Sequence, residues 1–139
     1  MAAAKQLLIV DDDKNTREGY RTYLSNAGFE VFALERGADA LAFARSAAPD
    51  LVVLDLALPD LDGWEVARRL KSDEATTSIP VIALSGHSRQ HEKVSALRAG
   101  CDVYLTKPCQ PAQLLSAIRK LLGLSASAAD ERAEAPEPY

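Results

Sequence analysis

A set of polar residues stands at the ends of short apolar runs, although its members lie far apart in the sequence. The set contains three carboxylates, a hydroxyl and an ammonium group, from Asp11, Asp12, Asp55, Ser85 and Lys107. If the apolar runs are strands of one parallel sheet, their carboxyl ends share one edge, which is where ligands bind in such sheets. We therefore expect these five side chains to converge on one site.

The convergence of these groups predicts a particular chemistry. Carboxylates that share a site repel each other unless a cation or protons compensate their charge. Oxygen ligands of this kind suit Mg²⁺, which takes one or two protein carboxylates and keeps several waters. A further carboxylate is then available to attack phosphorus, while the metal, a lysine and a hydroxyl stabilise the phosphoryl oxygens. The set therefore predicts Mg²⁺-dependent phosphorylation of an aspartate.

Taken singly, each of these residues also has a simpler explanation. One of the three consecutive aspartates could cap the helix that follows them. Asp13 is the best candidate for this cap, because the helix is expected to begin at Lys14. Ser85 alone fits a turn, and Lys107 alone fits a solvated loop. These explanations do not account for all five residues at one sheet edge.

The elements that must position the set can be read from the hydrophobic pattern. The apolar runs are continuous rather than alternating, as is typical of strands that helices cover on both faces. The predicted strands are Leu7–Val10, Glu30–Leu34, Leu51–Leu54, Val81–Leu84 and Val103–Leu105. Helix-length segments separate them. This alternation predicts an α/β fold with a doubly wound, open parallel sheet and helices on both faces.

The helical segments show apolar stripes and glycine stops. The clearest helix is Gln113–Leu122, and Val66, Ala67 and Leu70 form a similar stripe in another segment. Val94 and Leu97 are interpreted in the same way, as residues that face the core. Periodic segments are followed by Gly28, Gly100 and Gly123, as expected for left-handed residues at helix ends.

Length and composition favour one folded domain with a polar tail. The 139 residues carry a net charge of −4, without a strongly basic stretch, so we expect no direct nucleic-acid ligand. Residues 1–124 form the predicted domain, and the Ala-, Glu- and Pro-rich residues 125–139 have little to bury and are predicted to be disordered. No membrane-length apolar run or signal core occurs, so we expect a cytoplasmic protein.

The cysteines and histidines predict no further site. Cys101 and Cys109 lack the partners of a metal site and are expected to be reduced thiols. His87 and His91 are spaced as a metal-binding pair on a helix, but without a third ligand they are expected to face solvent. Trp64 is expected to pack near the predicted site.

Four stretches together resemble the receiver domain of two-component response regulators. They are LLIVDDD, PDLVVLDLALPDLDGWE, IPVIALSG and AGCDVYLTKP, and they cover about residues 5–122 in the order and spacing of that family. The resemblance implies a flavodoxin-like fold with five parallel strands in the order 2-1-3-4-5. It also implies that Asp55 is the phosphoacceptor and that Asp11 and Asp12 hold Mg²⁺ together with Asp55 and the backbone carbonyl of Ala57.

The same resemblance assigns a switch. Lys107 matches the phosphoryl-binding lysine and is followed by a bond to Pro108 that is typically cis, while Ser85 and Tyr104 match the switch residues. The implied donor is a histidine kinase or a histidine phosphotransfer protein. Phosphorylation is expected to reshape the face formed by the fourth helix, fifth strand and fifth helix, which would bind a downstream protein or a second copy.

Two other functions use related chemistry or the same fold. A phosphatase of the haloacid dehalogenase type needs a second aspartate two residues after the nucleophile, where this chain has Ala57. A flavin-binding module needs a phosphate-binding loop after the first strand, where the acidic residues 11–13 would repel a phosphate. Among response regulators, a single-domain form is favoured over a receiver cut from a larger protein, because the chain ends in the predicted disordered tail.

Overall fold

Strand and helix alternate five times in the part of the chain that this computed structural model describes, which is residues 4–86 and 90–124. The elements are β1 (Gln6–Val10), α1 (Lys14–Asn26), β2 (Glu30–Leu34), α2 (Gly37–Ala47), β3 (Leu51–Asp55), α3 (Gly63–Ser72), β4 (Val81–Ser85), α4 (Gln90–Arg98), β5 (Val103–Thr106) and α5 (Pro111–Leu122). The five strand predictions are confirmed to within one residue at each end.

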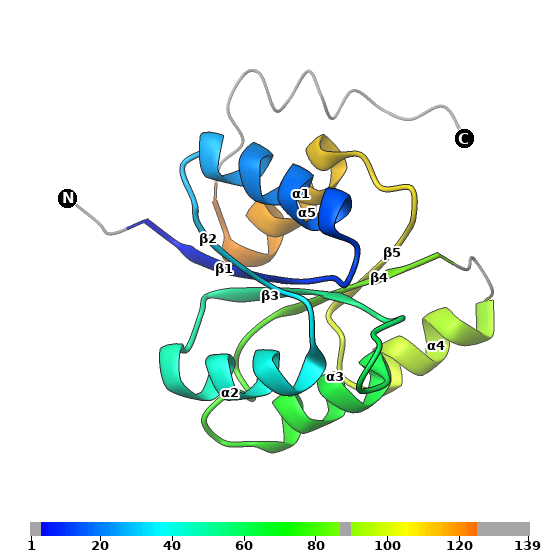
Figure 1. Cartoon of the computed structure of the whole chain (residues 1–139). Coiled ribbons are helices and arrows are strands. Elements are labelled where there is room, and N and C mark those ends of the chain that lie inside the picture. The colour runs from blue at the N-terminus through cyan, green and yellow to red at the C-terminus, as the bar shows by residue number, and fades with distance from the viewer. Residues whose placement is uncertain (1–3, 87–89, 125–139) are drawn as a thin grey trace.

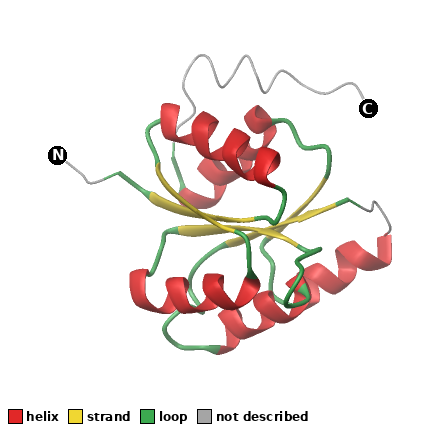
Figure 2. Ribbon diagram, in the orientation of Figure 1, coloured by secondary structure: helices red, strands yellow, loops and turns green. Residues whose placement is uncertain are grey.

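The strands form one parallel sheet in the order β2-β1-β3-β4-β5. Helices α1 and α5 cover one face of this sheet, and α2, α3 and α4 cover the other (Figure 1). Figure 2 shows the sheet as the middle of three layers. The flavodoxin-like α/β fold is therefore confirmed, and the carboxyl ends of all five strands lie at one edge.

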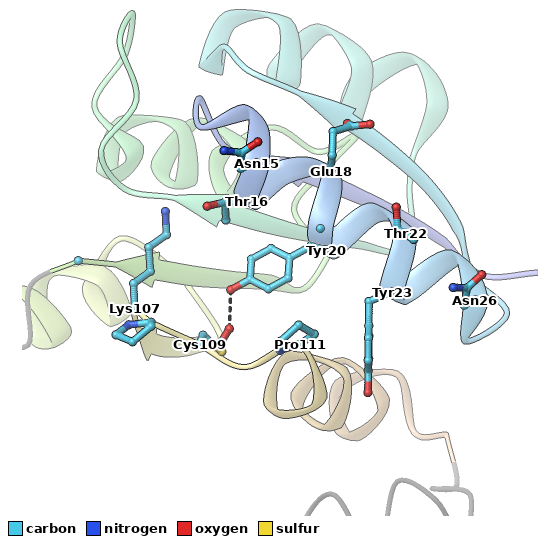
Figure 3. Close-up of a pocket in the computed structure, with 13 residues that line it drawn as sticks. Asn15, Thr16, Glu18, Tyr20, Thr22, Tyr23, Asn26, Lys107, Cys109 and Pro111 are labelled. Atoms are coloured by element: carbon cyan, nitrogen blue, oxygen red, sulfur yellow. Dashed lines mark hydrogen bonds between the residues drawn. The ribbon is translucent and has the colours of Figure 1, made fainter.

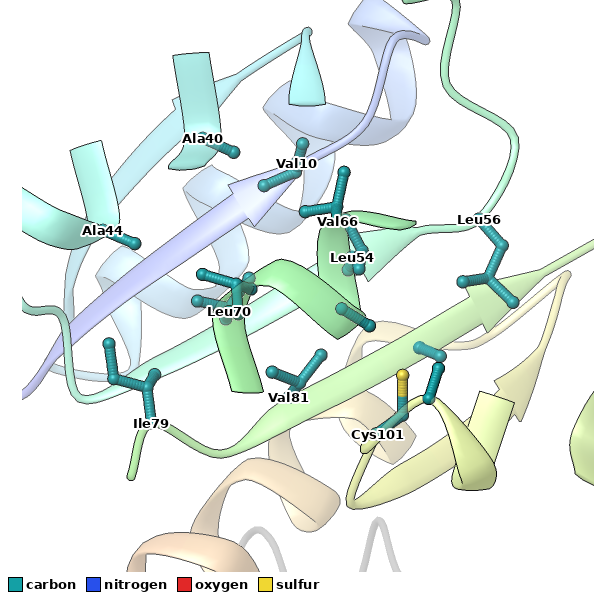
Figure 4. Close-up of a cluster of buried hydrophobic side chains, with 14 of the residues drawn as sticks. Val10, Ala40, Ala44, Leu54, Leu56, Val66, Leu70, Ile79, Val81 and Cys101 are labelled. Carbon is teal, nitrogen blue, oxygen red and sulfur yellow. The ribbon is translucent and has the colours of Figure 1, made fainter. Parts of the chain in front are cut away.

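The sheet separates two hydrophobic clusters, because successive strand residues point to opposite faces. Leu8 and Val10 of β1 belong to the cluster under α2, α3 and α4 (Figure 4), whereas Leu7 and Ile9 belong to the cluster under α1 and α5. Burial on both faces explains why the strand sequences are continuously apolar. Complete burial of a side chain such as Leu70 contributes about 1.5–3 kcal/mol.

Capping residues determine where several of the helices begin and end. Gly28, Gly100 and Gly123 have φ values of 102°, 105° and 69°, so their predicted left-handed conformation is confirmed. Helix α5 begins at Pro111, two residues before the predicted start, because Gln110 and Gln113 form a capping box ahead of it.

The prediction that Val94 and Leu97 face the core is wrong. These side chains are 37% and 44% exposed, and among the described side chains of α4, those of residues 93–98, that of Ala96 is fully buried. Two apolar residues three apart do not define which face of a helix is buried. The small side chain of Ala96 allows α4 to approach the layer below it, and this leaves the larger residues in solvent.

Candidate functional site

The carboxyl ends of β1, β3, β4 and β5 bring the predicted polar residues together. Asp55 is the last residue of β3, and Ser85 is the last residue of β4. Asp11 extends β1 by donating its backbone N–H to the carbonyl of Leu34 at 3.0 Å. The backbone N–H of Lys107 donates to the carbonyl of Ser85 at 2.7 Å, which fixes the end of β5 beside β4.

Three carboxylates form an acidic cluster at this edge. One carboxylate oxygen from each of Asp11, Asp12 and Asp55 lies within 4.8 Å of the other two. Asp11 and Asp55 are only 1% and 3% exposed, whereas Asp12 is exposed. Two buried carboxylates at this separation repel each other strongly. The donor set fits Mg²⁺, because it offers hard oxygen ligands on a partly open site where the ion can keep waters.

The ammonium group of Lys107 forms ion pairs with two carboxylates of the acidic cluster. Its Nζ atom lies 2.9 Å from Oδ2 of Asp11 and 3.5 Å from Oδ2 of Asp55. Burial alone would lower the pKa of Lys107, but the hydrogen bond and the negative charge of Asp11, together with Asp55, raise it. The lysine is therefore positively charged and points at both carboxylates.

The environment of Asp55 favours its protonated form more than water does. Burial raises the pKa of Asp55, and the charge of Asp11 raises it further. The backbone N–H of Ala57, which donates to Oδ1 of Asp55 at 3.1 Å, and the ammonium of Lys107 oppose this rise. A divalent cation beside Asp55 would compensate the same repulsion.

Asp13 has the structural role expected for a helix cap. Its Oδ2 accepts the backbone N–H of Thr16 at 2.9 Å and also the hydroxyl of Thr16. These two hydrogen bonds lower the pKa of Asp13. Helix α1 begins at Lys14, so the predicted cap is confirmed. The backbone N–H of Asp13 contacts the cluster by donating to Oδ1 of Asp11 at 2.9 Å.

The two exposed aspartates are therefore expected to differ in their effect on Mg²⁺. Asp12→Ala should weaken Mg²⁺ binding at least tenfold, because it removes a carboxylate of the cluster. Asp13→Ala should change the affinity less than about twofold, because the backbone N–H to Asp11 remains. The measurement is a Mg²⁺ titration followed by the fluorescence of Trp64, the single tryptophan. Equal losses in the two variants would contradict this division of roles.

A pocket of about 400 Å³ opens above the cluster, and Ser85 and Trp64 line it. Ser85 is 4% exposed, and Asp55 lines the same pocket. Trp64 also packs against the cluster under α2, α3 and α4, as predicted. Tyr104 is half-buried on β5 and packs against the same cluster. The side chain of Ala57 is exposed, and the predicted metal contact of its carbonyl stays a prediction.

Two residues that were not predicted as site residues, Gly63 and Asp60, hold the loop after β3. Gly63 donates its backbone N–H to the carbonyl of Leu56 at 3.2 Å. Asp60 accepts the N–H groups of Gly37 and Ala38 at 2.8 and 3.0 Å, and these bonds lower its pKa. Asp60 thereby ties the loop to the start of α2. The sequence signal was the Asp-Gly pair that opens α3, whereas nothing in the sequence connects Asp60 with α2.

The other predicted features lie away from the cluster. Cys101 and Cys109 are buried, unpaired with each other and on opposite faces of the sheet. Burial raises the pKa of Cys101 to about 11. His87 and the side chain of His91 lie outside the described residues. No helix within residues 4–86 and 90–124 combines the length and hydropathy needed to span a membrane.

Comparison with known proteins identifies what the chain is similar to. The profile of the response regulator receiver domain matches residues 7–119. The transcriptional regulatory protein GltR of Pseudomonas aeruginosa PAO1 is 40% identical over 121 residues, which are 87% of this chain and 50% of GltR. The chain spans about half the length of the curated relatives it matches.

Solved structures share the fold. A CheY-like receiver domain protein from Methanospirillum hungatei has a TM-score of 0.81 at 28% identity, covering 94% of this chain and 98% of that one. The receiver domain of the sensor histidine kinase PA1611 from Pseudomonas aeruginosa PAO1 also has a TM-score of 0.81 at 28% identity, covering 87% and 99%. A magnesium ion is coordinated in the active-site cleft of that receiver domain.

Proposed function

Because the chain belongs to the family of response regulator receiver domains, we propose that it is a phosphorylation-dependent signalling switch whose phosphoacceptor is Asp55. The observation that carries this proposal is the acidic cluster with an ammonium group directed into it. The three carboxylates are the Mg²⁺ site typical of receiver domains, and Lys107 contacts two of them. The phosphatase and flavin-binding alternatives lose their basis with this family assignment.

The phosphoryl transfer uses groups that are already in place. An oxygen of Asp55 attacks the phosphorus of a phosphohistidine, the P–N bond breaks, and an acyl phosphate forms on Asp55. Bound Mg²⁺ supplies positive charge that neutralises the phosphoryl oxygens. Lys107, now 3.5 Å from Asp55, then bonds to a phosphoryl oxygen, and the hydroxyl of Ser85 bonds to another. Asp11 and Asp12 would hold the metal together with Asp55.

The proposed donor is a histidine kinase or a histidine phosphotransfer protein, acting in the cytoplasm. The folded receiver is proposed to span residues 1–124, and residues 125–139 lie outside the described residues. Because the curated relatives are about twice as long, the single-domain form stays a prediction.

The test of the proposed phosphorylation is incubation with acetyl phosphate and Mg²⁺ followed by intact-mass measurement. We expect a gain of one phosphoryl group, and an unchanged mass would contradict the proposal.

The proposed output surface is formed by α4, β5 and α5. Ser85 would move towards the phosphoryl group, and Tyr104 of β5 would rotate into the space it leaves. A few kcal/mol of differential stability is enough for such a population shift. The exposed side chains of Val94 and Leu97 give this surface an apolar component that a downstream protein or a second copy could cover.

Ser85→Ala is expected to separate phosphorylation from the surface change. Asp55 should still gain a phosphoryl group, because Lys107 and the acidic cluster remain. The amide NMR shifts of Val94, Leu97 and Tyr104, which should move on phosphorylation of the wild type, should stay near their starting values. Ser85→Thr keeps the hydroxyl and is the matched control. Full shift changes in Ser85→Ala would remove Ser85 from the proposed switch.

A further inference from the structure

A groove of about 1070 Å³ runs beside the acidic cluster, between α1 and the loop from β5 to α5. Figure 3 shows its lining, with Tyr20 and Tyr23 on the α1 side and Lys107, Cys109 and Pro111 on the loop side. The groove shares Lys107 with the pocket above the cluster. Its wall therefore includes the residue whose ammonium group must meet the phosphoryl oxygens.

Tyr20 connects the two sides of this groove. Its hydroxyl donates a hydrogen bond to the backbone carbonyl of Cys109 at 2.7 Å, across 89 positions of sequence (Figure 3). Only 6% of Tyr20 is exposed, and its ring packs in the cluster under α1 and α5. Burial, with the nearby Cys109 thiol, raises the pKa of Tyr20 to about 12, so the hydroxyl keeps its proton near neutral pH.

The hydrogen bond from Tyr20 is one of two that bracket Lys107. On the β4 side, the N–H of Lys107 is bound to the carbonyl of Ser85 at 2.7 Å. Pro108 follows through a cis peptide bond and has no N–H to donate. The next residue, Cys109, is held on the α1 side by Tyr20. The short segment from Lys107 to Cys109 is therefore anchored at both ends.

Helix α1 also holds the partner of the Lys107 ammonium. Arg17 donates from its guanidinium to the backbone carbonyl of Asp11 at 2.9 Å. Arg17 and Tyr20 lie one turn apart on α1. The same helix thus fixes both Asp11, which accepts from Lys107 at 2.9 Å, and Cys109, two residues after Lys107.

We propose that Tyr20 is a positioning residue for phosphoryl transfer, because its hydroxyl holds the Lys107–Cys109 segment so that the Lys107 ammonium lies over Asp55. Tyr20 itself does not touch the reacting atoms. This inference rests on the proposed function and deepens it: the groove contains a hydrogen bond that sets the place of the phosphoryl-binding lysine.

The test is Tyr20→Phe, which keeps the ring and removes only the hydroxyl. The probe is beryllofluoride with Mg²⁺, a mimic of the phosphoryl group, titrated by Trp64 fluorescence. Loss of one hydrogen bond should weaken beryllofluoride binding by about fivefold. The Mg²⁺ affinity without beryllofluoride should change less than about twofold, because the three carboxylates are intact. Tyr23→Phe, one turn away in the same groove and exposed, is the matched control and should bind beryllofluoride like the wild type.

The double variant Tyr20→Phe with Lys107→Ala shows whether Tyr20 acts through the lysine. In the Lys107→Ala background, Tyr20→Phe should have no further effect on beryllofluoride binding. A further fivefold loss, or an equal loss of Mg²⁺ affinity in Tyr20→Phe alone, would show a general structural role and overturn the inference. If Tyr20→Phe binds beryllofluoride with the affinity of the wild type, the inference about Tyr20 is overturned and the proposed function is not affected. Failure of the wild-type protein to bind beryllofluoride overturns the proposed function and the inference with it.

Discussion

Asp55→Asn is expected to abolish phosphorylation by acetyl phosphate completely, because an amide oxygen does not act as the nucleophile towards phosphorus. The substitution conserves shape in a site that is 3% exposed, so the loss reports chemistry rather than packing. Burial and the charge of Asp11 oppose the ionised form of Asp55, so replacing the carboxylate with a neutral amide should not lower the melting temperature. Intact mass and thermal unfolding of the same sample measure both effects.

Asp50→Asn is the matched control for this substitution. Asp50 precedes β3, at the opposite edge of the sheet, where it accepts the backbone N–H of Gln6 at 2.7 Å. Its loss removes one carboxylate from the same part of the sequence without touching the acidic cluster, so phosphorylation should persist. A mass gain in Asp55→Asn would mean that another residue accepts the phosphoryl group, and the assignment of Asp55 would be wrong.

The strands and their parallel pairing could be predicted from local patterns that have few solutions, whereas the strand order came from the resemblance to receiver domains. Continuous apolar runs require burial on both faces, and alternation with helices leaves parallel pairing as the consistent arrangement. The burial of α4 could not be predicted in the same way. Among its described side chains, the one buried in the core is the small side chain of Ala96, whereas the larger Val94 and Leu97, which hydrophobic periodicity would place in the core, are exposed.

The acidic cluster and Lys107 could be predicted because each residue stands at a strand end, so the topology alone brings them together. The residues that fix the segments around the cluster could not be predicted. Tyr20 reaches Cys109 across the groove, and Asp60 reaches the start of α2, through contacts between segments far apart in sequence. A tyrosine in an amphipathic helix is usually a core residue, and an aspartate in a loop is usually solvated. Only three-dimensional contacts distinguish them from these common cases.

Gly63→Ala is expected to damage both stability and phosphorylation. A Cβ atom at this position would lie 2.5 Å from Cα of Leu56 and 2.9 Å from the carbonyl oxygen of Asp55. These are backbone atoms, so the loop after β3 must shift rather than a flexible side chain. Overpacking of this kind costs about 1–3 kcal/mol of the free energy of unfolding. Urea unfolding followed by circular dichroism measures this loss, and the phosphorylation rate should fall because Asp55 moves with the loop.

Gly19→Ala provides the comparison that identifies the cause. Gly19 lies within α1, and nothing lies within 4 Å of a Cβ atom added there. Alanine in a helix interior is favoured over glycine by about 0.5–1 kcal/mol, so this variant should be at least as stable as the wild type. Opposite changes in the two variants would show that the loss at Gly63 comes from close approach of the Asp55–Leu56 backbone. If Gly63→Ala has the same urea midpoint as the wild type, the loop after β3 accommodates the added Cβ atom without loss of stability. A loop that deforms so easily could not hold Asp55 in place.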